Sequence, residues 1–334
     1  MKTLMIGLTK TEGGSQRHII ELRKRIECDV LTMKEDITFV SELWANLSFA
    51  IAVYFWSLRL MFGKKAYDII HIHENLLYGL APLLGWRYKI VITVHGLKGF
   101  KFYDNKFLWF FFNHALFFAD RLIAVNLEDE KILNNAGLGR GHISYIPNGV
   151  DLSAYKHISP LIEKRIVYIG RIHKQKGIKY LLEAFCLIDD DRFKLEIIGD
   201  INNDYAGSLQ EYYKGTPNIT WRGSIKGRRE IVRSLKSAYM IVLPSLWEGL
   251  PLTLFEGLAS GRPMILSDIP AFKSIIKNEA LFFSSKNASD LKEKIIKLIK
   301  HKNLASSLGK KGKELAKQYD WNVIAEQTKR VYKE

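Results

Sequence analysis

Some patterns are missing from this chain of 334 residues, and each absence excludes a class of protein. With only two cysteines, Cys28 and Cys186, the sequence can form neither a disulfide framework nor a cysteine-based zinc cluster. The longest stretch without a charged residue, 43–58, has 16 residues, whereas a membrane-spanning helix needs about 20. We expect no signal peptide, because the N-terminus runs directly into a strand-like segment. The sequence therefore predicts a globular protein of the reducing cytoplasm.

Acidic residues are scarce relative to basic ones. The chain has 50 Lys and Arg against 35 Asp and Glu, a net charge of +15 with His neutral. Residues 1–150 carry +4 and residues 151–334 carry +11. Such a protein attracts anions, which include nucleic acids, anionic lipids and nucleotide phosphates. Because no nucleic-acid-binding module is found and the aromatic residues cluster in the less basic half, we expect no nucleic-acid partner.

Short apolar, β-branched runs alternate with helical patterns along the whole chain, which is typical of βαβ units and parallel sheets. The expected strands are 2–8, 29–32, 69–72, 89–94, 121–125 and 142–146, then 165–169, 194–198, 219–221, 240–243 and 264–266. A Pro-Asn-Gly turn at 147–149 separates the two series. The predicted fold is α/β, with two doubly wound, Rossmann-like domains that face each other across a ligand-binding cleft.

Two glycine-containing loops are candidate phosphate-binding sites. Gly13 and Gly14 follow the first strand and precede a helix, where backbone amides favour an anion, but a lone glycine pair is a weak signal and a plain tight turn is the simpler explanation. Residues 169–177 follow the first strand of the second half and carry Arg171 and Lys176. These cations suit a phosphate at the carboxyl edge of the sheet, and a solvated basic loop is the alternative.

Two carboxylates, Glu248 and Glu256, are separated by seven residues after the strand at 240–243. The first falls in a Gly/Pro loop and the second in the helix that follows, whose first amides could bind a diphosphate. Ionised carboxylates only accept hydrogen bonds and therefore suit the hydroxyls of a sugar or ribose. A helix-capping residue plus a surface residue would give the same spacing.

Together these motifs resemble glycosyltransferase family 4, whose members are retaining enzymes with the GT-B fold. The resemblance lies in residues 244–256, with its E-x7-E pattern, and in 261–263, 170–177, 146–151, 93–96 and the early glycine pair. The motifs follow the order and spacing of the family over nearly the whole chain. The resemblance implies three segments: an acceptor-binding domain at 1–152, a donor-binding domain at 153–318, and a C-terminal helix at 319–334 that crosses back to the first domain.

The resemblance also implies a nucleotide-sugar donor, linked to UDP or GDP, and a glycan or lipid-linked acceptor. Glu256 would bind the ribose, and Arg171 and Lys176 would bind the diphosphate, assisted by the amides of Leu252 and Thr253. These cations would stabilise the departing diphosphate, so that no metal or other cofactor is expected.

The remaining implied residues concern the sugar and the walls of the site. Glu248 would contact the donor sugar and stabilise its oxocarbenium character, and His95 would reach the sugar from the first domain. Further substrate-binding positions would be Gly13, Gly14, Asn148, Gly223, Ile225 and Gly249. The alternatives are a nucleotide-sugar epimerase of the same fold, a nucleic-acid-binding protein, and a binding subunit that has kept the fold without the activity.

Two patterns that resemble metal sites have simpler interpretations. Residues 189–191 form an Asp-x-Asp pattern between a helix and a strand, which we interpret as a polar turn. His71 and His73 alternate on one strand, but no cysteine or carboxylate completes a zinc set. We expect a structural role, or a place at the edge of the cleft, for both histidines.

Two further segments suggest peripheral contact with an anionic membrane. Residues 44–56 and 107–118 of the first domain are rich in aromatic side chains, which could form buried helices or dock on lipid. Residues 286–317 contain ten lysines against three acidic residues, which is typical of a solvated helix face or of a surface that attracts anionic lipid. The expected location is the cytoplasm, with peripheral association at the inner membrane face.

Overall fold

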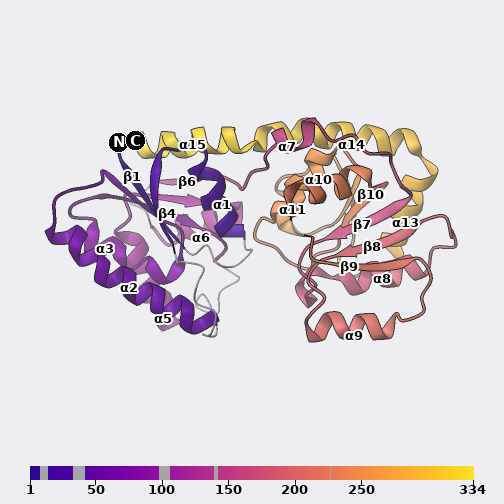
Figure 1. Ribbon diagram of the computed structural model, residues 1–334, viewed down its shortest axis with the longest axis horizontal. Coiled ribbons are helices and arrows are strands. Elements are labelled where there is room, and N and C mark those ends of the chain that lie inside the picture. Colours follow the sequence, from indigo (N-terminus) through magenta and orange to yellow (C-terminus); the bar gives the residue numbers. More distant parts are fainter. Residues whose placement is uncertain (8–13, 33–41, 98–105, 139–141, 226) are drawn as a thin grey trace. The chain divides into compact units, whose positions relative to one another are not determined.

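The computed structural model describes residues 1–7, 14–32, 42–97, 106–138, 142–225 and 227–334. The chain forms two compact units, which are described separately (Figure 1). The first unit comprises residues 1–148 and 321–334, and the second comprises residues 149–320.

A parallel sheet of six strands forms the centre of the first unit. Its strands are β1 (Thr3–Ile6), β2 (Cys28–Leu31), β3 (Ile69–Ile72), β4 (Lys89–Val94), β5 (Arg121–Ala124) and β6 (Ile143–Tyr145). They lie in the order β2-β1-β3-β4-β5-β6. The chain therefore starts at β1, turns to one side for β2, and then returns to build the other side from β3 onward. The point between β1 and β3 is the switch point at which doubly wound sheets bind ligands.

Helices cover both faces of this first sheet. They are α1 (Gly14–Arg23), α2 (Glu42–Phe62), α3 (Leu80–Leu84), α5 (Lys106–Phe117), α6 (Leu127–Asn135) and α15 (Trp321–Lys333). Because successive side chains of a strand point to opposite faces, Ile90 and Ile92 of β4 join a core with α2, α3 and α5. On the opposite face, the hydroxyl of Thr93 contacts His71, whose other ring nitrogen contacts the hydroxyl of Tyr332 in α15. The C-terminal helix is therefore part of the first unit.

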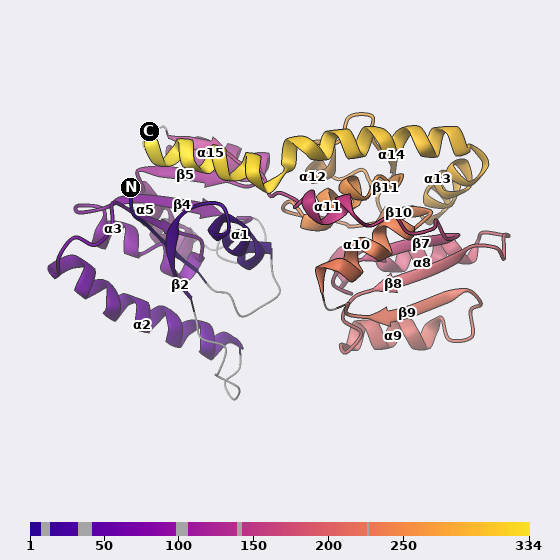
Figure 2. The same cartoon turned by 45° about the horizontal axis from the view of Figure 1, so that its top comes forward.

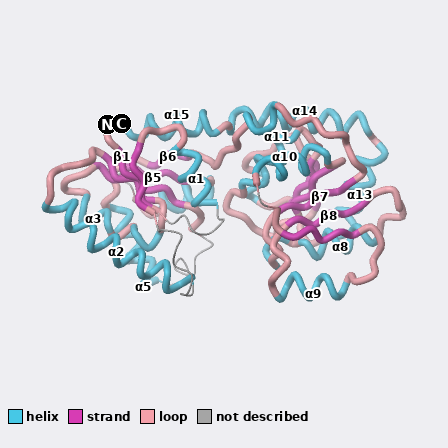
Figure 3. The backbone as a smooth tube through the Cα atoms, in the orientation of Figure 1, coloured by secondary structure: helices cyan, strands magenta, loops and turns pink. Residues whose placement is uncertain are grey.

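The second unit also has a parallel sheet of six strands (Figure 3). Its strands are β7 (Arg165–Ile169), β8 (Lys194–Ile198), β9 (Ile219–Gly223), β10 (Met240–Leu243), β11 (Met264–Ser267) and β12 (Leu281–Phe283). The order is β12-β11-β10-β7-β8-β9, which places the switch point between β7 and β10. Every strand that we predicted is present, and the two sheets confirm the α/β fold class. The sequence analysis missed β12, which is only three residues long.

Two apolar cores cover the two faces of the second sheet. The helices that contribute to the unit are α7 (Ser153–Lys156), α8 (Ile178–Cys186), α9 (Asp204–Tyr212), α10 (Arg228–Ser237), α11 (Leu252–Ser260), α12 (Pro270–Lys273), α13 (Ala288–Lys300) and α14 (Lys302–Ala316). Val167 and Ile241 point toward α10 and α11, whereas Ile166 and Met240 point toward α8 and α13. The apolar runs of the central strands reflect this burial on both faces.

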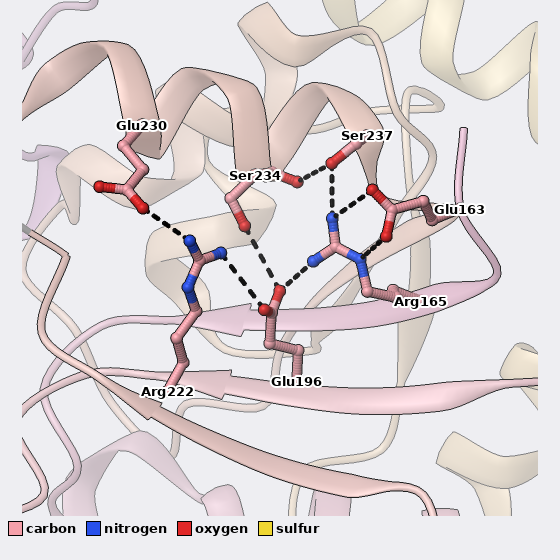
Figure 4. A network of polar contacts seen from close by, with 7 residues as sticks. All are labelled: Glu163, Arg165, Glu196, Arg222, Glu230, Ser234 and Ser237. Carbon is pink, nitrogen blue, oxygen red and sulfur yellow. Dashed lines mark hydrogen bonds and ion pairs between the residues drawn. The ribbon is translucent and has the colours of Figure 1, made fainter. Parts of the chain in front are cut away.

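A buried carboxylate, Glu196 in β8, ties three strands to α10 (Figure 4). It binds Arg165 of β7 and accepts a hydrogen bond from Arg222 of β9 at 3.3 Å. The hydroxyl of Ser234 in α10 donates to the same carboxylate at 3.4 Å. Each arginine has a further acidic partner nearer the surface, so the charge of Glu196 is held inside a network rather than in a single pair.

The segments at which the chain enters and leaves the second unit pair with each other. The amide of Val150 donates to the carbonyl of Tyr319 at 2.8 Å, and the amide of Leu152 donates to the carboxylate of Asp320 at 3.2 Å. These bonds hold together two stretches that are far apart in sequence.

Among the helices of the described residues, none combines the length and the apolar character that crossing a membrane requires.

Candidate active site

The candidate site of the second unit lies where β7 and β10 end. These neighbouring strands flank the switch point of the sheet, and ligand-binding crevices of α/β sheets form outside the carboxyl ends of such strands. The loop 170–177 follows β7, and the loop 244–251 follows β10. Both motifs that the sequence analysis singled out in this half therefore start from adjacent strand ends.

The two loops are in direct contact. Gly177 has a left-handed φ of 62°, and a Cβ at this position would lie 2.0 Å from the carbonyl oxygen of Pro244. Only glycine allows this approach without strain. The amide of Leu246 donates to the carbonyl of Gln175 at 2.8 Å, and the side-chain amide of Gln175 donates to the carbonyl of Trp247 at 3.0 Å. These bonds fix the position of one loop relative to the other.

This contact brings two predicted catalytic residues together. The Nζ of Lys176 lies 2.6 Å from Oε1 of Glu248, and the two side chains are only 12% and 7% exposed. The hydroxyl of Ser245 donates to the same Oε1 at 2.7 Å. Hydrogen bonds between charged groups are short and strong, and partial burial strengthens them further. The carboxylate is therefore held in one orientation, and its charge is compensated by a lysine rather than by water.

Arg171, the other predicted cation, is exposed on the same loop. Its backbone carbonyl accepts a hydrogen bond from the hydroxyl of buried Tyr168 at 2.7 Å. Burial raises the pKa of Tyr168 well above its usual value, so the hydroxyl stays protonated and keeps donating. The guanidinium of Arg171 makes no hydrogen bond or ion pair to any residue that the structure describes. Its position is thus fixed through the backbone while its charge faces solvent.

The N-terminus of α11 contributes further polar groups. Leu252 and Thr253 begin the helix, and Pro251 at the N-cap provides no side-chain cap for their amides. The first amides of a helix lack partners within the helix and favour an anion. Glu256 lies one turn further along and is buried, with 4% exposure. Gly249 precedes the helix in the loop that carries Glu248.

Two of the predicted substrate-binding positions, Gly223 and Ile225, lie further along the same edge of the sheet. Gly223 is the last residue of β9, has a φ of 71°, and accepts a hydrogen bond from the amide of Gly199 at 3.0 Å. Ile225 is half-buried and packs against the core shared with α10 and α11. Because β8 separates β9 from β7, these residues are not next to Lys176 and Glu248 in the structure.

In the first unit, four histidines gather at the carboxyl ends of the strands and on α1. Nδ1 of His73, just after β3, lies 3.4 Å from Nε2 of His95, just after β4. The ring of His18 in α1 lies 5.1 Å from that of His95 and 5.5 Å from that of His73. His71 packs against His73, with ring centroids 4.0 Å apart. Predicted catalytic His95 is therefore surrounded by imidazole rings.

Burial keeps this histidine cluster neutral. It lowers the pKa of His18 to about 4 and lowers the pKa values of His71, His73 and His95 well below the usual range. Neighbouring imidazoles act in the same direction, because each positive charge would repel the next. His95 can therefore offer a hydrogen bond to a ligand but does not carry a positive charge near neutral pH.

Asn148 joins the cluster from the segment that leads into the second unit. Its Oδ1 lies 3.0 Å from Nδ1 of buried His18, which places the proton of His18 on Nδ1. The sequence analysis missed His18, for which the only signal was a histidine four residues after the glycine pair. Gly13 lies outside the described residues, and Gly14 is the first residue of α1. The His, Cys, Asp and Glu side chains in the described ranges form no group of three or more suited to a metal ion.

Comparisons with known proteins match both halves of the chain to glycosyltransferase families. A family described as "Glycosyltransferase Family 4" matches residues 13–154, and one described as "Glycosyl transferases group 1" matches residues 154–315. An Escherichia coli UDP-Gal:alpha-D-GlcNAc-diphosphoundecaprenol alpha-1,3-galactosyltransferase is 32% identical over 250 residues, which are 67% of this chain and 63% of the relative. A Campylobacter jejuni N,N'-diacetylbacillosaminyl-diphospho-undecaprenol alpha-1,3-N-acetylgalactosaminyltransferase is 28% identical, over 64% of this chain and 60% of the relative. The matched part thus spans somewhat less than two thirds of these two relatives.

Two solved structures show the same fold. HepE from Anabaena, solved in complex with UDP and glucose, aligns with a TM-score of 0.82 at 15% identity and covers 100% of this chain and 99% of its own. Sucrose-phosphate synthase from Thermosynechococcus elongatus aligns with a TM-score of 0.81 at 20% identity, over 100% and 98% of the two chains. The comparisons do not favour an epimerase or a nucleic-acid-binding protein. With matches that together span residues 13–315, the chain belongs to the family 4 glycosyltransferases and has the GT-B fold.

Proposed function

We propose that this chain is a retaining, metal-independent glycosyltransferase that moves a hexosyl group from a nucleotide sugar to a lipid-linked or glycan acceptor. The observation that supports it best is the Lys176–Glu248 pair, held 2.6 Å apart at the switch point of the second sheet. One member of this pair is suited to a phosphate and the other to a sugar that gains positive charge. The names of the relatives favour a UDP-linked donor and a diphospho-undecaprenol acceptor, with an α linkage in the product.

The charges of the site suit the departure of a nucleoside diphosphate. Arg171, Lys176 and the first amides of α11 would surround the diphosphate and stabilise the negative charge that grows as its bond to the sugar breaks. These fixed positive groups do the work that a metal ion does in other enzymes. Glu256 would accept hydrogen bonds from the ribose hydroxyls.

Glu248 would act on the sugar rather than on the leaving group. Its carboxylate would stabilise the oxocarbenium character of the anomeric carbon while the ion pair holds it in place. The acceptor hydroxyl would form its bond to this carbon on the face that the diphosphate leaves, and its proton would pass to the departing phosphate oxygen. His95, neutral and oriented by the histidine cluster, would bind a hydroxyl of the donor sugar from the first unit.

A lipid-linked acceptor would confine the reaction to a membrane. We therefore propose that the chain acts in the cytoplasm, at the inner face of a membrane, with the donor taken from solution. Gly14, Asn148, Gly223, Ile225 and Gly249 would line the site around donor and acceptor.

Thermal unfolding with and without ligands tests the proposal. UDP, GDP, ADP and their hexose conjugates are added in the presence and absence of EDTA, because a ligand that binds the folded state raises Tm. We expect one nucleotide to raise Tm equally with and without EDTA, and Glu256→Ala to weaken this effect. Glu211→Ala, at an exposed glutamate of the same unit, is the matched control. A shift that EDTA abolishes, or that survives Glu256→Ala unchanged, would contradict the proposed site.

A further inference from the structure

The helices α2, α3 and α5 of the first unit expose apolar side chains where a surface helix normally exposes polar ones. They lie on one side of the first sheet, and α3 contacts both α2 and α5 (Figures 1 and 2). On α2, the exposed residues Ile51, Phe55, Leu58 and Phe62 recur at the spacing of one helix face. Phe55 and Phe62 are 70% and 80% exposed. This helix is apolar both toward the core and away from it.

The helix α5 repeats the pattern. Phe110, Phe111 and Phe117 are exposed, whereas Ala115 and Leu116 of the same helix are buried in the core. Together with Leu83 of α3 and Trp86 just after it, these side chains and those of α2 form what we call the aromatic face. Monomeric proteins rarely expose apolar patches of this extent unless the patch binds something.

Basic residues flank the aromatic face at the end of α2. The guanidinium of Arg87 donates to the carbonyl of Met61 at 2.5 Å and also binds the carbonyl of Gly63. These bonds bring Trp86 beside the end of α2, next to exposed Lys64 and Lys65. Arg59 is exposed on α2 itself.

Acidic residues are scarce in the sequence of this region. No Asp or Glu occurs in 43–67, in 75–103 or in 105–119, and the connections between the three helices contain only Asp68, Glu74 and Asp104. A second copy of the chain would bring the same positive charges against these ones, which opposes self-association through this face. Anionic headgroups would instead neutralise them, while the aromatic rings enter the acyl region below.

We propose that the aromatic face is a monotopic docking surface for an anionic phospholipid bilayer. This proposal rests on the proposed function, because the docking surface would bring the enzyme to a lipid-linked acceptor. The lysine-rich helices α13 and α14 are the weaker candidate, because no large apolar side chain is exposed between residues 288 and 316. Lys294 of α13 is, moreover, paired with Asp290, and Lys317, just after α14, is paired with Glu314.

Vesicle flotation tests the surface directly. The intact chain is mixed with vesicles of phosphatidylcholine, with or without phosphatidylglycerol, and no acceptor is present. The triple variant Phe55→Gln, Phe62→Gln, Phe111→Gln leaves the charge unchanged and should reduce binding to the phosphatidylglycerol vesicles on the order of 100-fold. The matched control replaces three exposed apolar residues of the second unit, Leu161, Leu187 and Tyr212, by Gln and should float like the wild type.

Two further measurements separate the possible outcomes. The shift in Tm caused by the nucleotide should be the same in the triple variant and the wild type, so that loss of docking is distinguished from loss of folding or of the donor site. Lys64→Gln with Lys65→Gln should remove the preference for phosphatidylglycerol and the sensitivity to salt. The proposal is overturned if the wild type does not float, if the triple variant floats equally well, or if the variant only dissociates a dimer of the wild type.

Discussion

Acid should destabilise the first unit through its buried histidines, and His18 gives the clearest magnitude. An unfolded histidine has a pKa of about 6.5, whereas burial lowers the pKa of His18 in the folded chain to about 4. Between these values the unfolded chain binds a proton that the folded chain does not. The stabilising contribution is therefore complete above pH 6.5 and is lost progressively as the pH falls toward 4. It changes by about 1.4 kcal/mol per pH unit, or about 3 kcal/mol over the whole range.

The groups packed around His18 modify this value. The pKa values of His71, His73 and His95 are also lowered by burial, so these residues act in the same direction. Asp129, in the same unit, acts in the opposite direction, because burial raises its pKa to about 6 and the folded chain then takes up a proton first. Asp129 should cancel the effect of about one histidine between pH 6 and 4.

Urea denaturation at several pH values between 7.5 and 4.5 measures the effect, with circular dichroism and tryptophan fluorescence as probes. The free energy of unfolding of the first unit should fall steeply with acid, and His18→Gln should reduce this slope by about 1.4 kcal/mol per pH unit. His301→Gln, at an exposed histidine of the second unit, controls for the substitution itself. If His18→Gln leaves the slope unchanged, His18 is not buried in the neutral form and the reasoning is refuted.

Three further substitutions test the second unit. Lys176→Met leaves the carboxylate of Glu248, which is only 7% exposed, without its cation. The variant should lower transfer activity on the order of 100-fold and the free energy of unfolding by about 2 kcal/mol. Wild-type kinetics in this variant would exclude the pair from catalysis. Gly177→Ala puts a Cβ against the carbonyl of Pro244 and should lower Tm and donor affinity together, whereas an unchanged Tm would show that the loops separate easily. Glu196→Gln removes the charge that two arginines share and should cost about 1–3 kcal/mol in urea denaturation, without changing donor binding at saturation.

The fold was largely predictable because its central strands are buried on both faces. Such strands appear in sequence as continuous apolar runs, and this signal located β7, β8 and β10 without any knowledge of their order. The strand β12 was not predicted, although β6, which also has three residues at the edge of a sheet, was.

The candidate site was predictable as a set of loops but not as a set of contacts. Lys176 and Glu248 are 72 residues apart, and only the adjacency of β7 and β10 brings them together. His18 and Asn148 are 130 residues apart, and no local pattern connects them. The burial that makes the histidines neutral depends on the packing of α15, whose Tyr332 is 261 residues away from His71 in sequence.

The aromatic segments show why composition alone left two interpretations open. Residues 44–56 and 107–118 contain enough apolar side chains to fill a core and still place others on the surface. Their composition was therefore compatible both with burial and with lipid docking. The structure separates the two sets on α2, where Val53 and Leu60 are buried and Phe55 and Phe62 are exposed.

The membership of α15 in the first unit has a consequence for how the chain is made. Trp321 packs against His18, and Tyr332 binds His71, so the first unit lacks part of its interior until residues 321–333 have left the ribosome. The second unit, by contrast, has all its residues once position 320 has emerged. The second unit can therefore complete its fold before the first. The nascent first unit, in which α15 does not yet cover its part of the sheet, should depend on chaperones for longer than the second.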